Sequence, residues 1–311
     1  MKQRAILFPG QGAQAPGMGK DLAGAHPECG ALFARANEIL GRDLAKLCFE
    51  GPAEELTRSH NCQPAIFVVS VAAYRALQKE SPGASFAATA GLSLGEWSAL
   101  HAAGALSFED AVRVLEARGR FMQEACDQRP GGMVSVMGLP LDKAREIAQV
   151  AGVEVANLNS EDQTVLSGDR AGIEQAAKLA GEAGAKRAVV LNVAGAFHSS
   201  LMAPAAGRLE ELLSRISFQA PSIPVISNVT GQPHGGPDDI RREMVRQVTS
   251  SVQWVSTVQW MRSSGMGEYV ECGPGKVLSG LTKRIDKDAV VHNIQDLATV
   301  KKVAAAMQAT A

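Results

Sequence analysis

Short apolar runs alternate with longer amphipathic stretches along the chain, and this alternation predicts an α/β fold. Apolar runs of strand length cover residues 5–8, 86–90, 134–137, 153–156, 164–167, 188–191, 225–227 and 269–271. Helical spacing predicts helices between them, among which are residues 65–79, 96–103, 108–125, 171–183, 201–214 and 240–248. Strands that alternate with helices favour a mainly parallel sheet.

The order of the elements changes in the middle of the chain. After the sequence RPGG (residues 129–132), a strand, a helix, two strands, a helix and a strand follow up to about Asn192. This βαββαβ order is typical of a ferredoxin-like unit. The proline and glycines before it indicate an inserted subdomain. We therefore expect a small domain at residues 131–193 and a large α/β domain built from residues 1–130 and 194–311.

Composition places the chain among ordinary globular proteins. Its 311 residues are 46% hydrophobic and 20% charged, which suits one large domain with an insert. The formal net charge of −1 gives no general reason to expect nucleic acid or an anionic membrane as a partner. No apolar run reaches transmembrane length, and the first residues lack the apolar core of a signal peptide. The five cysteines, without Cys-x-x-Cys, favour reduced thiols in a cytoplasm over a disulfide framework or zinc site.

Ser93 lies in the sequence GLSLG (residues 91–95), which has the pattern Gly-x-Ser-x-Gly. The pattern alone is weak, but here it falls between a predicted strand and a predicted helix. Glycines at such a turn avoid Cβ clashes, and the helix start points backbone N–H groups toward the serine. This setting favours a nucleophile over the alternative, an ordinary serine N-cap.

A second glycine-rich turn, FPGQGAQ (residues 8–14), follows the first predicted strand. It matches neither a Walker loop nor Gly-x-Gly-x-x-Gly, so a phosphate site has little support. Gln11 between two glycines could bring a backbone N–H close to a ligand; taken alone, the segment fits a plain loop equally well.

A serine nucleophile needs a base, and the best-placed histidine is His198 in AGAFHSSLMAP. It follows a predicted strand and begins a helix, where the helix dipole lowers an imidazole pKa and keeps the ring able to accept a proton. The side chain of His101 is expected to point along its own helix, and His26, His60 and His234 lie in polar, loop-like sequence. A structural histidine at position 198 stays open on this argument alone.

Arg118 lies on the apolar stripe of a helix that begins at the capping pair Ser107 and Asp110. A guanidinium on a core-facing stripe is costly unless an anion pairs with it. That anion is either an internal acidic side chain or a substrate carboxylate held bidentately.

Taken together, the chain resembles the malonyl-CoA:acyl carrier protein transacylase family. The resemblance rests on FPGQGAQ, NCQPAI, GLSLGEWSAL, Arg118, GAFHS, VQW and ECGPGKVLSGLTKRI, in this order over nearly the whole chain. It implies a hydrolase-like α/β core with a ferredoxin-like insert, which agrees with the pattern of elements. It also implies malonyl transfer to the thiol of acyl carrier protein, without cofactor or metal.

The resemblance assigns a role to most of the candidate residues. Ser93 would be the nucleophile that forms a malonyl ester, and His198 the general base and then acid. Arg118 would pair with the malonyl carboxylate. The backbone N–H groups of Gln11 and Leu94 would form the oxyanion hole.

Three further positions follow from the same resemblance. The backbone carbonyl of Gln247 would orient His198 in place of an aspartate, which agrees with the absence of acidic residues from 183 to 209. Gln63 would lie near the substrate. Phe197 matches the malonyl-selective form of its motif, in which a bulky ring leaves no room for an α-methyl group.

The chain departs from the family pattern at three places. Leu92 stands where histidine is frequent, Trp97 where tyrosine is frequent, and Ser250–Ser251 where Asn-Pro is frequent. Leu92 and Trp97 are expected beside the site, where they could alter acyl preference or rate. None of the three removes a catalytic group.

The implied partners are malonyl-CoA and an acyl carrier protein, with no nucleic acid and no membrane, and the protein is expected to be a cytoplasmic monomer. Acyl carrier proteins are acidic, and one segment near the end carries Lys276, Lys283, Arg284 and Lys287. This segment is either a docking patch or a solvated helix face.

Two other classes of function compete. A serine esterase or thioesterase of the α/β-hydrolase type shares Gly-x-Ser-x-Gly and would use a late histidine, here His292. A non-catalytic acyl-CoA or carrier-protein binding module would not need Ser93.

Overall fold

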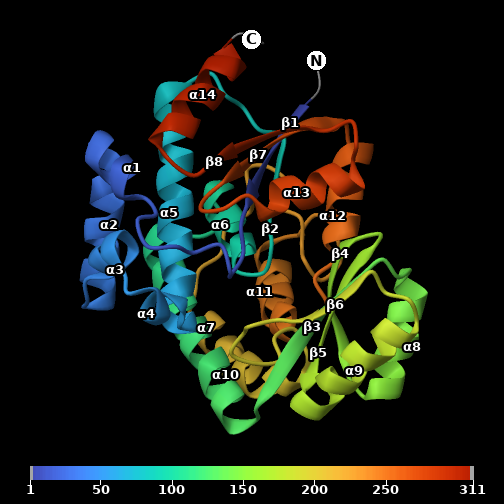
Figure 1. The fold of residues 1–311 in the computed structure, drawn as a ribbon. Coiled ribbons are helices and arrows are strands. Elements are labelled where there is room, and N and C mark those ends of the chain that lie inside the picture. Colours follow the sequence, from blue (N-terminus) through green and yellow to red (C-terminus); the bar gives the residue numbers. More distant parts are fainter. Residues whose placement is uncertain (1–2, 309–311) are drawn as a thin grey trace.

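The computed structural model describes residues 3–308, within which the strands form two four-stranded sheets (Figure 1). In spatial order, the first sheet contains β2 (Ala88–Gly91), β1 (Gln3–Phe8), β7 (Met266–Cys272) and β8 (Val290–Ile294). All its pairings are parallel. The second contains β4 (Glu154–Ser160), β5 (Gln163–Asp169), β3 (Gly131–Met137) and β6 (Arg187–Val190), paired antiparallel.

Helices connect and cover the strands. Those of the first 130 residues are α1 (Lys20–Ala25), α2 (Pro27–Leu40), α3 (Leu44–Glu50), α4 (Ala53–Thr57), α5 (Ser59–Glu80), α6 (Gly95–Ala102) and α7 (Phe108–Gln128). Those of the remaining chain are α8 (Leu141–Ala151), α9 (Arg170–Glu182), η1 (Ser200–Met202), α10 (Ala203–Leu213), α11 (Pro237–Arg246), η2 (Gln247–Thr249), α12 (Trp254–Ser263), α13 (Val277–Ile285) and α14 (Leu297–Gln308).

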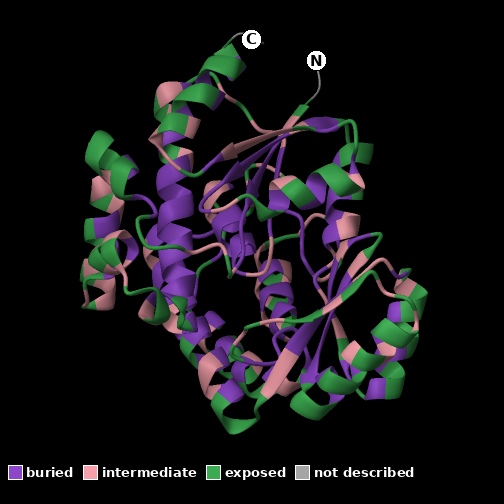
Figure 2. Cartoon of the chain, in the orientation of Figure 1, coloured by how far each residue is buried: buried purple, intermediate pink, exposed green. Residues whose placement is uncertain are grey.

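The parallel sheet is buried on both faces. Along β1, Ile6 and Phe8 join one apolar cluster with side chains of α5, α6 and α7. The alternate residues Ala5 and Leu7 join a second cluster with α12 and α13. Figure 2 shows the sheet and α5 as the main buried region. A strand with two apolar faces reads as a continuous apolar run, which is why ILF was recognisable in the sequence.

The antiparallel sheet has its own core on one side. Val134, Val136 and Leu166 pack against Ile147 of α8 and Ile173 of α9. Side chains that point to the opposite face, such as Met133 and Val165, belong to the cluster of the large core. The inner face of the small sheet therefore belongs to the same core as the helices that cover the parallel sheet.

The predicted runs agree with the strands except at two places. Residues 225–227 are not a strand: Val225 makes a single parallel bridge to Thr89, and Ile226 a single antiparallel bridge to Pro233. The edge strand β8 was missed, because its sequence VVHNI mixes apolar with polar residues and only Ile294 is buried.

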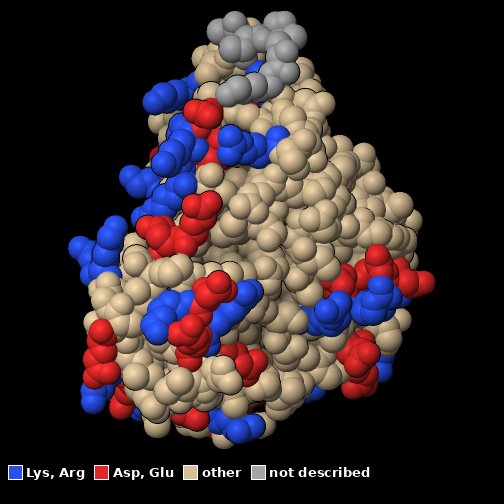
Figure 3. Space-filling view, turned by 90° about the vertical axis from the view of Figure 1, so that its right-hand side faces the viewer, with Lys and Arg blue, Asp and Glu red and all other residues tan. Residues whose placement is uncertain are grey.

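Charged groups do not gather by sign on the face shown in Figure 3, where acidic and basic side chains lie next to one another around a broad uncharged area. Within residues 3–308, no helix is long and apolar enough to cross a membrane. All five cysteines are buried as free thiols.

Candidate active site

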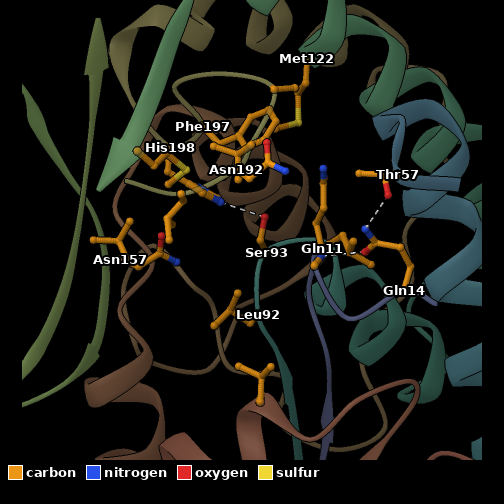
Figure 4. Close-up of a pocket in the computed structure, with 18 of the residues that line it drawn as sticks. Gln11, Gln14, Thr57, Leu92, Ser93, Met122, Asn157, Asn192, Phe197 and His198 are labelled. Carbon is orange, nitrogen blue, oxygen red and sulfur yellow. Dashed lines mark hydrogen bonds between the residues drawn. The ribbon is translucent and has the colours of Figure 1, made fainter. Parts of the chain in front are cut away.

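A cavity of about 550 Å³ lies between the carboxyl ends of β1 and β2 and the inner face of the small sheet. Figure 4 shows Ser93 and His198 pointing toward each other in it, with Gln11, Leu92 and Phe197 nearby. The opposite wall carries Met133, Asn157 and Val165. Clefts beyond the carboxyl ends of parallel strands are the usual ligand sites of open α/β sheets.

Ser93 occupies a sharp turn between β2 and α6 in a left-handed backbone conformation, with φ of 53°. The turn needs both of its glycines. A Cβ on Gly91 would lie 1.9 Å from the Gly95 carbonyl carbon, and a Cβ on Gly95 would lie 2.2 Å from the Phe8 carbonyl oxygen. The motif is thus required by close backbone contacts, and strain at a non-glycine residue is typical of functional sites.

Asn228 holds this turn from the far side. Its Oδ1 accepts a hydrogen bond from Ser93 N at 2.6 Å, and its Nδ2 donates to the Gly91 carbonyl at 2.7 Å. Asn228 is fully buried. It therefore supplies the hydrogen bonds that the strained turn cannot make within the helix or the strand.

His198 lies within reach of the serine. Ser93 Oγ and His198 Nε2 are 2.9 Å apart. His198 Nδ1 lies 2.9 Å from the Gln247 carbonyl and 3.2 Å from the Ser250 carbonyl, so Nδ1 carries the hydrogen and Nε2 is free to accept one. His198 has φ of 58°, and together with Ser93 it is one of two non-glycine residues with positive φ in the described chain.

The environment keeps His198 unprotonated. Burial and then the positive charge of Arg118 lower its pKa to about 4, although the two carbonyl hydrogen bonds act in the opposite direction. At pH 7 the ring is therefore a neutral base.

Arg118 reaches the same point from α7, with 1% of its surface exposed. Its NH2 donates to Ser93 Oγ at 3.2 Å and to Gln247 Oε1 at 2.9 Å, and its NH1 donates to Gln63 Oε1 at 2.7 Å. Burial lowers its pKa to about 10, which leaves it charged at pH 7. No acidic side chain of residues 3–308 lies within ion-pair distance of it, so the internal salt bridge considered above is absent from the described structure.

Gln247 is in contact with Ser93, His198 and Arg118. Besides its carbonyl bond to His198, its Nε2 donates to the Ser93 carbonyl at 2.9 Å and its Oε1 accepts from Arg118. Gln63 also contacts Met122 through Nε2, at 3.6 Å from the sulfur. Both glutamines are buried.

Two residues that line the cavity have backbone N–H groups with no acceptor in the described chain. Gln11 and Leu94 both line it, and neither N–H donates to another residue of the described chain. Leu94 precedes the first residue of α6, so the partial positive charge of the helix N-terminus makes its N–H a stronger hydrogen-bond donor.

The remaining histidines lie elsewhere. His101 Nδ1 bonds the Leu106 carbonyl, and His292 pairs with Glu268 at 3.2 Å on β8. His234 was expected in a polar loop, but its side chain is fully buried against Glu96, at 2.7 Å. Residues 3–308 hold no group of three His, Cys, Asp or Glu that could bind a metal ion.

The three departures from the family pattern have different surroundings. Leu92 lines the cavity, whereas Trp97 is fully buried in the large core. The Ser250 carbonyl accepts from His198, and Ser251 Oγ donates to the Val155 carbonyl. Sequence reasoning missed Asn228 and His234, which only the fold brings to this site, and it gave no role to Glu96, three residues after Ser93.

Comparison with known proteins gives consistent matches. The family described as "Acyl transferase domain" matches residues 6–305. Malonyl CoA-acyl carrier protein transacylase of Escherichia coli strain K12 is 45% identical over 289 residues, covering 92% of this chain and 93% of the relative.

Solved structures agree. An acyl carrier protein S-malonyltransferase from Vibrio cholerae superposes with a TM-score of 0.93 at 40% identity, covering 97% of this chain and 99% of that one. A malonyl-transacylase in complex with a type II polyketide synthase acyl carrier protein gives 0.93 at 39% identity, covering 98% and 99%.

Proposed function

This chain belongs to the acyl transferase family, among the malonyl-CoA:acyl carrier protein transacylases, and we propose that it works through a malonyl ester on Ser93. It transfers the malonyl group from malonyl-CoA to the phosphopantetheine thiol of an acyl carrier protein, for fatty acid or polyketide synthesis. The observation that carries the assignment of residues is that His198 Nε2 and Arg118 NH2 both reach Ser93 Oγ, at 2.9 Å and 3.2 Å.

The first half-reaction forms the ester. His198 Nε2 takes the proton of Ser93 as Oγ attacks the thioester carbonyl, and the N–H groups of Gln11 and Leu94 stabilise the oxyanion. The C–S bond then breaks, and His198 gives its proton to the leaving thiolate, which departs as CoA. Its carbonyl contacts hold His198 Nδ1–H in place throughout.

The second half-reaction reverses these roles. His198 takes the proton of the phosphopantetheine thiol, and the thiolate attacks the Ser93 ester. When the C–Oγ bond breaks, His198 returns the proton to Ser93 Oγ. The net reaction exchanges one thioester for another and consumes no water.

Arg118 is the residue that selects malonyl. A malonyl ester carries its free carboxylate only three carbons from Oγ, within reach of a guanidinium that already donates to Oγ. The current acceptors of Arg118 are neutral, so a carboxylate can replace one of them with a charge-assisted bond. Gln63 holds NH1, and the ring of Phe197 lies in the cavity beside His198, where it limits branching next to the carbonyl.

Intact-mass measurement tests this function. After separate mixing with malonyl-CoA, acetyl-CoA and methylmalonyl-CoA, we expect one malonyl group on Ser93, little modification by the other two, and its removal by a carrier-protein thiol. A malonyl adduct on another residue, or hydrolysis faster than transfer, would refute the proposal. An esterase using His292 has no support in the geometry, because His292 lies on the edge strand β8, outside the residues that line the cavity of Ser93.

We further propose that residues 131–193 form a ferredoxin-like subdomain inserted in a hydrolase-like α/β domain of residues 1–130 and 194–311, of which residues 1–2 and 309–311 lie outside the described part of the chain. The antiparallel order β4-β5-β3-β6 and the separate core under α8 and α9 support this division. We also propose that the protein is cytoplasmic, which agrees with five buried, unpaired thiols, and that it is a monomer. Light scattering of the purified protein tests the monomer, and a dimeric mass would refute it.

A further inference from the structure

A buried carboxylate lies directly behind the site and has no part in the reaction described above. Glu96 is in the first turn of α6, three residues after Ser93, and 1% of its surface is exposed. Its Oε2 accepts from Gln247 Nε2 at 2.6 Å and from Asn228 N at 3.2 Å, and its Oε1 contacts His234 Nε2 at 2.7 Å.

The Gln247 side chain connects this carboxylate to Arg118. Its Nε2 faces Glu96 and its Oε1 faces the guanidinium, at 2.6 Å and 2.9 Å. A primary amide thus bridges a buried anion and a buried cation that do not touch each other. Glu96 is also the one charged group that raises the pKa of Arg118 against the effect of burial.

An amide can occupy such a place in two orientations of nearly equal shape. With NH2 toward Glu96 and oxygen toward Arg118, both ends make charge-assisted hydrogen bonds. In the reverse orientation, a donor would face the guanidinium and an acceptor would face the carboxylate. The negative charge of Glu96 therefore favours the observed orientation of the Gln247 amide, and the Ser93 carbonyl, which accepts from the same Nε2 at 2.9 Å, favours it as well.

We propose that Glu96 is a positioning residue for acyl-group selectivity. It fixes the orientation of the Gln247 amide, whose neutral oxygen holds Arg118 next to Ser93 and leaves the guanidinium without a bound anion. A direct pair with Glu96 would block the guanidinium, because an incoming carboxylate would have to displace a charge. Through the amide, Arg118 is held by a neutral oxygen that a substrate carboxylate can compete with. This inference rests on the proposed function, in which Arg118 binds the malonyl carboxylate.

The test is Glu96→Gln, which keeps the shape and removes the charge. A glutamine oxygen can still accept from Gln247 and Asn228 while its NH2 faces His234. Malonyl-CoA and acetyl-CoA compete for the enzyme, and the ratio of the two acylation rates is measured by intact mass. A hydrogen bond to a charged group is more stabilising than a neutral one by a free energy that corresponds to about a tenfold change in an equilibrium constant. We therefore expect the malonyl-to-acetyl ratio to fall roughly fivefold to tenfold, with acetylation retained.

Two controls make the result specific. Glu243→Gln changes another buried acid, bound to Ser227 at 2.9 Å and Arg246 at 2.8 Å, and should leave the ratio unchanged. In the Arg118→Ala background, Glu96→Gln should have no further effect on the ratio, because its influence travels through Arg118. Equal effects in both backgrounds, or an equal effect of Glu243→Gln, would overturn the inference.

Other outcomes are equally decisive. An unchanged ratio, or parallel loss of both donors, would make Glu96 a structural residue only, and a raised ratio would make it a competing anion. If Glu96→Gln does not fold, Glu96→Asp is the second variant, because it keeps the charge but moves it away from Gln247. A malonyl-to-acetyl ratio equal to that of the wild type in Glu96→Asp would then overturn the inference. Failure of the proposed function is distinguishable, because it would appear as an unchanged ratio in Arg118→Ala itself.

Discussion

Arg118→Ala removes a guanidinium that donates to Ser93 Oγ, Gln63 and Gln247 from a position with 1% exposure. A malonyl ester on Ser93 would then hold its carboxylate in the same poorly solvated place without a partner. Leaving such a charge unpaired costs roughly 2–5 kcal/mol. Malonylation should therefore lose roughly 30- to 4,000-fold in kcat/KM. Acetyl has no carboxylate, so acetylation should persist or increase.

The same change also leaves Gln63 Oε1 and Gln247 Oε1 without their donor. Each buried, unsatisfied acceptor costs about 1–3 kcal/mol, so the melting temperature should fall whatever Arg118 does for the substrate. Selectivity, not stability, is thus the informative readout. Competition between malonyl-CoA and acetyl-CoA in single-turnover acylation measures it, with Arg118→Lys as a variant that keeps charge without the fork. Equal losses for both donors would refute the carboxylate clamp.

Three further outcomes follow from the site and its surroundings. With the pKa of His198 lowered to about 4, the acid limb of kcat/KM should lie near pH 4 instead of near pH 6.5. The unfolded chain takes up that proton at higher pH than the folded protein does. Stability should therefore fall as the pH drops from about 6.5 to about 4, and it should fall less in His198→Ala. Equal acid losses in both proteins would contradict this. Gly95→Ala should lower the melting temperature and abolish acylation, since its Cβ would meet the Phe8 carbonyl at 2.2 Å, whereas Gly207→Ala, with open space around it, should not; similar behaviour of the two would count against the close-contact argument. Lys283→Glu and Arg284→Glu, on an exposed face of α13, should slow transfer to the acidic carrier protein and weaken its salt dependence, and a salt-independent, unchanged rate would show that the patch is idle.

Some of the site was predictable because its residues sit in short local patterns. Gly91, Ser93 and Gly95 are fixed by backbone contacts within one turn, so the sequence carries their signal directly. Arg118 was recognisable because a charged residue interrupts an apolar helical stripe. Its partners were not, since Gln63 and Gln247 lie 55 and 129 positions away in the chain.

The roles of Asn228, Glu96 and His234 could not be predicted from the sequence for the same physical reason. Each is an ordinary polar residue in its own segment, and the burial of its side chain arises only when β2, α6 and the segment after Val225 pack together. A local pattern records the face of one element. It does not record which distant polar group will satisfy a buried donor, such as Ser93 N.

Under the proposed function, the position of Arg118 also couples the choice of acyl group to the pKa of His198. In the free enzyme its positive charge is, after burial, the second cause of the lowered pKa of His198. A malonyl carboxylate bound to Arg118 would offset that charge, so the pKa of His198 should rise when the correct acyl group is present, whereas an acetyl group leaves it unchanged. The acid limb of kcat reports the occupied enzyme and that of kcat/KM the free enzyme. With malonyl-CoA the kcat limb should therefore lie at higher pH than the kcat/KM limb, and with acetyl-CoA the two should coincide. Coinciding limbs for both donors would show that Arg118 binds no carboxylate while the base is at work.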